Sequence, residues 1–426
     1  MLGWMTALGA LAAEPRPEAN VALRNWFSLM LELVRHTPTY SPPVASRAFG
    51  YLGVIAFESR VGGSTELESL VGQLAGLDAV PQREPGAVYD DAVILDTALA
   101  VAMQSFFQNT GPTGQHAVAA AEKKWRDETN AGVSLDVVKR SEAFGRAMAE
   151  SVISWSQSDG GAKIENMGFP LKYDLPKGDG KWVPTSLISQ QQLPLLPAWG
   201  DNRTFVMPSG ATCPLTPPFA YSESPDSDFY KDALEVYQTT KALDADQTAI
   251  ARFWSDDPML STTPPGHWIS IALQVAEQKQ MSLDDSVDLF ARLGVAMSDA
   301  FVGCWHQKFI YNLVRPVTYI KKFIDPKWEP ILITPPFPEY PSGHSTVSAA
   351  AATVLTAFLG DNFAFDDETG GRDGRKPRHF ASFLSAADEA GISRLYGGIH
   401  FRAAIERGLE QGRCIGAYAV ALRTRK

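Results

Sequence analysis

Apolar residues at helical spacing run through most of the chain, and this pattern constrains its fold more than any other feature. The spacing predicts helices on both sides of a long break in the pattern, and Asn130-Ala131-Gly132 interrupts the last helical stretch of the first half. The predicted helical stretches are residues 20–36, 43–61, 87–108, 116–157, 228–243, 246–254, 267–280, 282–314, 342–359, 380–395 and 400–423. No convincing stretch alternates apolar and polar residues as a half-buried strand would. The predicted fold class is therefore all-α.

Residues 158–225 form the break, and they divide the predicted chain into three parts. This segment is rich in proline and glycine, and such a long loop in a compact protein is usually functional or disordered. Its aromatic residues, Trp182, Trp199, Phe205 and Tyr221, favour an ordered layer. We expect two helical bundles packed together, at 14–157 and 226–426, with 158–225 as a long covering loop. The loop forms either the wall or lid of a site, or an ordered connection.

Charge and hydropathy exclude several kinds of partner. With 38 Lys+Arg and 48 Asp+Glu the formal net charge is −10, which argues against nucleic-acid binding. No window reaches about 18 uninterrupted apolar residues, so no membrane span is predicted. Residues 1–13 resemble the end of a secretory signal, but no Lys or Arg precedes the apolar run. Export and a cytoplasmic location stay alternatives, and homo-oligomerisation is left open.

Three cysteines, Cys213, Cys304 and Cys414, are far apart in the sequence, and no CxxC pair occurs. This usage argues against a structural zinc site and against a disulfide framework, although a single bridge stays open. Cys304 and Cys414 lie in apolar helical stretches, so both are predicted to be buried core residues. The polar loop 366–376 lacks the spacing of a calcium-binding loop and is predicted to be a solvated excursion.

The first segment that suggests chemistry ends the helix predicted over 282–314. Lys308 and Arg315 are seven residues apart, close to two helical turns, so they share a face. Pro316 disfavours helical geometry at the residue before it, which places Arg315 at the helix end. Two cations on one face at a helix terminus can converge on an anion, but alone they are more often a solvated face.

Two further segments add an anion-binding helix start and a histidine. In Pro341-Ser342-Gly343-His344 the proline precedes a strong helix, so the backbone N–H groups that follow it are predicted to be free at a positive helix end. Gly343 has no side chain and lets an oxyanion approach closely. Further on, Gly397-Gly398 interrupts a helix and lets Arg394 and His400 point to one locus.

Together the segments make the signature K-x6-RP, PSGH and SR-x5-H over residues 308–400. This signature resembles the superfamily that unites vanadium-dependent haloperoxidases with type 2 phosphatidic acid phosphatases and bacterial acid phosphatases, and the chain length resembles the haloperoxidase branch. The resemblance implies a vanadate-dependent enzyme that oxidises halide with hydrogen peroxide to a hypohalous equivalent, with a small organic acceptor. The alternative it implies is an acid phosphatase that uses the same pocket through a phosphohistidine.

The resemblance also implies roles for individual residues. His400 would be the ligand to vanadium, or the nucleophile in a phosphatase, and His344 the acid–base group opposite it. Lys308 would activate bound peroxide. The oxygens of vanadate would be held by the cations and the helix start, namely Lys308, Arg315, Ser342, Gly343 and Arg394.

Three more positions surround this predicted site. Trp305 and Phe337 resemble the chloroperoxidase pattern, although chloride and bromide stay alternatives. Asp256 either orients Arg394 or caps the chain before Pro258. Of the remaining histidines, His267 is predicted to line the entrance, and none is predicted to be a metal ligand.

Overall fold

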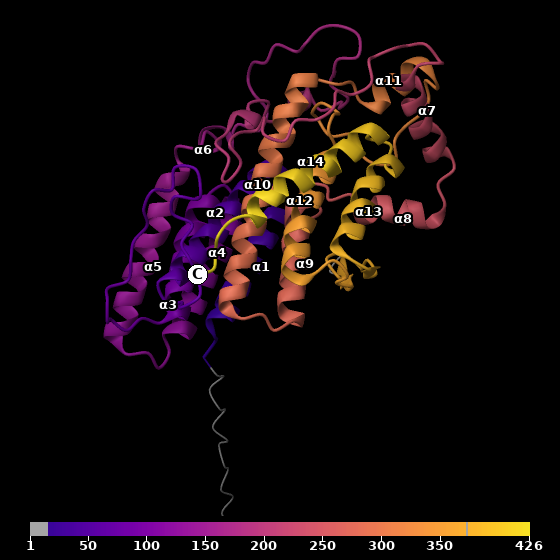
Figure 1. Cartoon of the computed structure of the whole chain (residues 1–426). Helices are drawn as coiled ribbons and strands as arrows, with labels where there is room; N and C mark the ends of the chain where they lie inside the picture. Colours follow the sequence, from indigo (N-terminus) through magenta and orange to yellow (C-terminus); the bar gives the residue numbers. More distant parts are fainter. Residues whose placement is uncertain (1–15, 372–373) are drawn as a thin grey trace, which may run out of the picture.

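The computed structural model describes residues 16–371 and 374–426 and consists almost entirely of helices (Figure 1). Its elements in chain order are α1 (Ala19–Arg35), α2 (Pro42–Val61), α3 (Asp91–Phe106), α4 (Gly111–Asn130), α5 (Leu135–Ser156), α6 (Gly161–Ile164), η1 (Ser189–Gln191), η2 (Trp199–Asp201), α7 (Asp228–Lys241), α8 (Ala245–Phe253), α9 (Thr263–Gln278), α10 (Leu283–Tyr311), α11 (Pro316–Phe323), α12 (Gly343–Leu359), β1 (Phe365–Asp367), β2 (Arg378–Phe380), α13 (Phe383–Tyr396) and α14 (Arg402–Val420).

The all-α prediction is confirmed, with one small addition. β1 and β2 pair antiparallel, with Phe365 opposite Phe380, at the two ends of the loop 366–376 that is predicted to be a solvated excursion. That prediction is wrong for Asp367, which is fully buried, while its neighbour Asp366 is exposed. The predicted break at Asn130 is confirmed, because α4 ends there. No helix within the described parts of the chain is long and apolar enough to cross a bilayer.

Small residues let the central helices approach closely. A Cβ on Gly294 of α10 would lie 2.5 Å from the carbonyl oxygen of Phe49 on α2, so only glycine fits there. On α14, a Cβ on Gly408 would lie 2.8 Å from the carbonyl oxygen of Ser342 at the start of α12. The buried apolar side chains of the N-terminal helices and of α9–α14 belong to one continuous cluster. This packing fixes the helix ends that carry the signature residues.

The segment between α5 and α7 is ordered and is fastened to the helices beneath it. Asp299 on α10 accepts hydrogen bonds from three successive backbone N–H groups, those of residues 205–207, at 2.6 to 3.0 Å. A disulfide joins Cys213 in this segment to Cys414 on α14. The prediction that Cys414 is a buried core residue is wrong, because its side chain is exposed and bonded; Cys304 is buried as predicted. The disulfide spans 201 residues, so local spacing gave no sign of it.

Candidate functional site

The three signature segments meet at helix ends. Lys308 lies in the last turn of α10, and Arg315 is the N-cap residue of α11. Ser342 is the N-cap residue of α12. Arg394 lies in the last turn of α13, and His400 follows in the short connection to α14. Helix ends leave backbone groups without helical partners, so side chains placed there can share a polar locus.

Lys308 is fully buried, and its ammonium group donates to the carbonyl oxygens of Pro338, Glu339 and Pro341. The three carbonyls fix the ammonium beside the segment that leads into α12. Burial, together with the nearby charge of Arg315, lowers the pKa of Lys308 to about 7, although Cys304 and Glu339 oppose the shift. A negative ligand would stabilise the charged form of this lysine.

Arg315 and Arg394 are buried guanidinium groups held largely by backbone oxygens. Arg315 donates to the carbonyl oxygens of Phe337 and Ile399, each at 2.9 Å, while Arg394 donates to those of Ala251 and Trp254. Burial lowers the pKa of both arginines to about 10, which leaves them charged at neutral pH. Within the described chain, the buried Nη2 of Arg315 has no hydrogen-bond partner.

Glu339, which the sequence analysis missed, fixes the orientation of His400. Its Oε1 accepts from Nδ1 of His400 at 2.7 Å and from the backbone N–H of Phe401 at 2.9 Å. Nε2 of His400 therefore keeps its lone pair, and it lies 3.1 Å from Nη1 of Arg315. Burial, followed by Arg315 and Lys308, holds the pKa of His400 well below its usual value, so the ring is neutral. A neutral imidazole whose Nε2 carries a lone pair is the form that ligates a metal, and in this structure that lone pair accepts a hydrogen bond from Nη1 of Arg315.

The start of α12 provides donors and space. The prediction of a free backbone N–H on Ser342 is wrong, because that group donates to the carbonyl oxygen of Ala404 at 3.0 Å. The Ser342 hydroxyl accepts from Ser345 Oγ at 2.9 Å and keeps its own hydrogen for another acceptor. A Cβ on Gly343 would lie 3.8 Å from the Trp305 ring, in ordinary van der Waals contact, and the glycine itself lines a cavity.

His344 follows Gly343 in the first turn of α12. Its Nε2 is buried without a hydrogen-bond partner among the residues described, and it lies 3.9 Å from Oδ2 of Asp256. Burial, followed by the charges of Arg394 and His267, holds the pKa of His344 well below its usual value. The ring is thus neutral at pH 7 and can accept a proton.

Asp256 contacts two histidines. Its carboxylate oxygens lie 3.0 and 3.1 Å from Nδ1 of His267, whose Nε2 lies 2.7 Å from Asp367. The prediction that His267 lines the entrance is wrong, because its side chain is only 2% exposed. Asp367 is not among the predicted site residues, because nothing in its polar loop marks one aspartate above the others. Glu339, by contrast, is a charged residue in a run of prolines and aromatics, a signal that could have revealed it.

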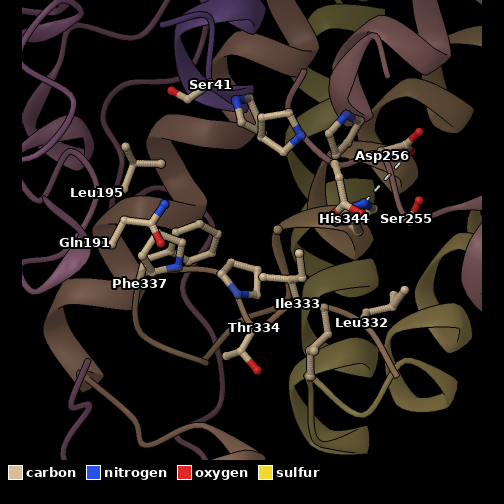
Figure 2. A pocket seen from close by; sticks show the side chains of 18 of the residues that line it. Ser41, Gln191, Leu195, Ser255, Asp256, Leu332, Ile333, Thr334, Phe337 and His344 are labelled. Atoms are coloured by element: carbon tan, nitrogen blue, oxygen red, sulfur yellow. Dashed lines mark ion pairs between the residues drawn. The ribbon is translucent and has the colours of Figure 1, made fainter. Parts of the chain in front are cut away.

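A cavity of about 470 Å³ opens onto these residues (Figure 2). Figure 2 shows Phe337, Gln191 and Leu195 on one side of it and His344 with Asp256 on the other. Trp305 and Phe337 pack with ring centroids 4.9 Å apart, and the Trp305 N–H donates to the carbonyl oxygen of Leu195. His344, Arg394 and His400 line the cavity together with further polar residues, Ser41, Ser186, Gln191, Ser255, Asp256, Asp257 and Thr334, and the remaining wall is mostly apolar.

These residues fit a tetrahedral oxyanion such as vanadate. The charges of Arg315, Lys308 and Arg394 all act on His400, whose Nε2 lies 3.1 Å from Nη1 of Arg315. Among the described residues, Arg315 Nη2 and His344 Nε2 are buried without hydrogen-bond partners. Gly343, which lines the cavity, has no side chain to obstruct the oxygens, and charge-assisted donors bind them strongly when water is excluded. Fold and site thus define a helical oxyanion-binding protein with a histidine that can ligate the central atom.

Comparisons with known proteins identify the family to which this chain belongs. A family model described as the VCPO second helical-bundle domain matches residues 288–327 and 321–426. The crystal structure described as the first bacterial vanadium-dependent iodoperoxidase superposes with a TM-score of 0.84 and is 36% identical, covering 95% of this chain and 97% of that one. The chain belongs to the vanadium-dependent haloperoxidase family, so its cofactor is vanadate.

Two further relatives extend the comparison. The vanadium chloroperoxidase of Curvularia inaequalis is 27% identical over 255 residues, a match that spans 44% of this chain and 42% of the fungal protein. A bacterial vanadium-dependent chloroperoxidase in its holo form superposes with a TM-score of 0.71 and 14% identity, covering 91% of this chain and 92% of that one. At that identity the likeness shows the fold alone.

Proposed function

We propose that this protein oxidises halide with hydrogen peroxide to a hypohalous equivalent, using vanadate held at His400. The observation that carries the proposal is the neutral imidazole of His400, fixed by Glu339 and set among three buried cations. Vanadate, when bound, supplies Lewis-acid activation of hydrogen peroxide. No specific observation favours the phosphatase alternative.

The residues of the chain are proposed to bind the cofactor oxygens and to accept a proton from the substrate. Lys308, Arg315 and Arg394 neutralise the oxygens of the cofactor, and Ser342 and the Gly343 backbone add donors. His344, neutral and with Nε2 unpartnered among the described residues, accepts a proton from hydrogen peroxide. In this structure the three hydrogens of the Lys308 ammonium go to carbonyl oxygens, so Lys308 contributes its positive charge to the site and not a free donor.

Vanadate reconstitution and the His400→Ala variant test whether His400 is the ligand to vanadium. Metal-free wild-type protein should gain halide oxidation on addition of orthovanadate and should show no comparable turnover of a phosphate ester. His400→Ala should lose tight vanadate binding and turnover together, because the single protein bond to vanadium is gone. Unchanged vanadate affinity in this variant would refute the assignment of His400.

We propose iodide and bromide as the preferred halides. The indole N–H of Trp305 is already used by the carbonyl oxygen of Leu195, at 3.2 Å, so it is not available to hold chloride. The similarity to a bacterial iodoperoxidase along 97% of that chain also supports this choice. Steady-state kcat/KM for the three halides at one pH tests it; a value for chloride equal to that for bromide would instead favour the chloroperoxidase pattern of Trp305 and Phe337.

The organic acceptor is proposed to be apolar. The cavity wall away from the cations includes Phe169, Ile188, Met259, Leu260 and Ile333. Met259, Leu260 and Ile333 are each more than half exposed, an unusual use of apolar residues unless they meet a ligand. Enzyme supplied with equal amounts of a phenol and an alkylated phenol should halogenate the alkylated one in excess of the ratio given by free hypohalous acid. Identical ratios would show that acceptors react outside the cavity.

A further inference from the structure

A buried histidine outside the oxyanion site lies behind His344. His267 on α9 lies between two carboxylates, those of Asp256 and Asp367, with the shortest nitrogen–oxygen distances 3.0 and 2.7 Å. Its ring stacks on Trp254, with centroids 4.4 Å apart. These contacts join the segment before α9, α9 itself and strand β1.

A charged His267 accounts for this arrangement. Burial alone would lower its pKa, but the charges of Asp256 and Asp367 outweigh burial and raise the pKa of His267 to about 10. Both ring nitrogens then donate, one to each carboxylate. The three side chains together carry one net negative charge. An isolated pair of Asp256 and His267 would carry none.

This negative charge is directed at His344. Asp256 has left-handed backbone geometry, with φ of 47°, and its Oδ2 lies 3.9 Å from Nε2 of His344, the pair joined by the dashed line in Figure 2. The distance is too long for a hydrogen bond, so the interaction is electrostatic. Other groups also act on the pKa of His344. The charges of Arg394 and His267 lower it, whereas backbone hydrogen bonds at residues 254 and 255 raise it, and His400 interacts electrostatically with the same ring.

We propose that His267 and Asp367 are positioning residues that hold the Asp256 carboxylate against His344, where it stabilises the imidazolium formed as His344 takes a proton from hydrogen peroxide. In that step an O–H bond of peroxide breaks, an N–H bond forms at Nε2, and the electron pair stays on the peroxide oxygen. Asp256 stays ionised throughout, as the buried aspartate of a serine protease triad does. The proposal rests on the proposed peroxidase function.

Three single variants test it: Asp256→Asn, Asp367→Asn and, as matched control, Asp366→Asn. Asparagine tolerates left-handed geometry, so Asp256→Asn should fold. Asp366 adjoins Asp367 in β1 but pairs with the exposed His379 at 2.8 Å. With vanadate bound, kcat for bromide should fall ~10²-fold in Asp256→Asn and ~10-fold in Asp367→Asn, and stay within about twofold in the control.

The vanadate affinity of the variants shows whether the substitutions affect only His344 or disrupt the whole oxyanion site. Both site variants remove a negative charge near an anion, so the vanadate Kd of the metal-free protein should be unchanged or lower while kcat falls. A Kd that rises tenfold along with the loss of turnover would show a merely structural role and overturn the proposal. Wild-type turnover in Asp256→Asn or Asp367→Asn would overturn it equally.

A spectroscopic readout does not depend on turnover. In ¹⁵N-histidine-labelled metal-free protein at pH 8, one buried histidine should show two protonated ring nitrogens, and Asp367→Asn should remove or shift that signal while Asp366→Asn leaves it. Only neutral imidazoles in the wild type would refute the charged His267. A wild-type protein that binds vanadate but oxidises no halide would instead refute the proposed function, and this proposal with it.

Discussion

Glu339 offers the sharpest test of how the protein prepares His400. Oε1 of Glu339 accepts from both His400 Nδ1 and the Phe401 N–H, and the whole side chain is buried. Glu339→Ala removes the acceptor that selects the ring tautomer. A hydrogen bond to a charged group contributes ~1.5–3 kcal/mol, and ~1.4 kcal/mol is a factor of ten in affinity. Vanadate affinity should therefore fall about 10- to 100-fold, the range typical for such supporting residues.

Glu339→Gln separates the hydrogen bond from the charge. The amide oxygen can still accept from His400 and Phe401, while the negative charge that faces Lys308 and Arg315 is lost. The gain in positive potential offsets the weaker acceptor, so affinity should stay within about fivefold of wild type. Burial raises the pKa of Glu339 to about 8, although Arg315 and Lys308 lower it, so the comparison is best made at pH 9, where the carboxylate is ionised.

The assay is equilibrium dialysis of metal-free protein against orthovanadate at constant salt, with vanadium measured by elemental analysis. Glu58→Ala is the matched control, because Glu58 is also buried and accepts from Ser69 and the backbone N–H of Leu70. It lies sixteen residues along α2 from Pro42, which lines the cavity, or roughly 24 Å away. Wild-type affinity in Glu339→Ala, or an equal loss in Glu58→Ala, would refute the reasoning.

Four other outcomes are expected. Phosphate should compete with vanadate for the same donors, so reconstitution in phosphate should give less activity, restored by excess vanadate; indifference to phosphate would count against a shared oxyanion site. His344→Ala should lose ~10²- to 10⁴-fold in bromide oxidation while vanadate Kd rises only moderately, both measured on one preparation. The folded pKa of His267 lies above its ordinary value of 6.5, so its contribution to stability is full below pH 6.5 and is lost as pH rises toward 10; the free energy of unfolding by urea should decline over this window, by up to ~5 kcal/mol from this group, and less steeply in Asp367→Asn. Replacing Cys213 and Cys414 by serine should cost up to ~5 kcal/mol in the same assay, because their bridge closes a loop of 201 residues; an unchanged urea midpoint would show that the bridge does not form in solution.

The site residues whose positions could be predicted from the amino-acid sequence are those at the ends of helices. Lys308 and Arg315 could be placed together because a helical repeat and the following proline fix their relation. The start of α12 followed from Pro341 and the apolar helix behind it. Residues close together in the sequence determine this local geometry, so short sequence motifs are enough to predict it.

The supporting carboxylates could not be placed in this way. Glu339 and His400 are 61 residues apart, and His267 and Asp367 are 100 apart. Their contacts depend on how α9, the β1–β2 hairpin and the segment before α12 pack in three dimensions. The same holds for the bridge from Cys213, since no helical period relates it to Cys414.

The segment between α5 and α7 has one part that is fastened to the helices and another part that lines the cavity. Asp299 and the disulfide at Cys213 fasten residues 205–213, whereas Ser186, Ile188 and Gln191 reach the cavity from a stretch of short turns. Substitutions or length changes in that stretch alter the shape presented to an organic molecule and leave the oxidising centre, built on α10–α13, untouched. Grafting a different sequence into residues 186–191 should therefore change selectivity among organic acceptors and leave the rate of halide oxidation unchanged.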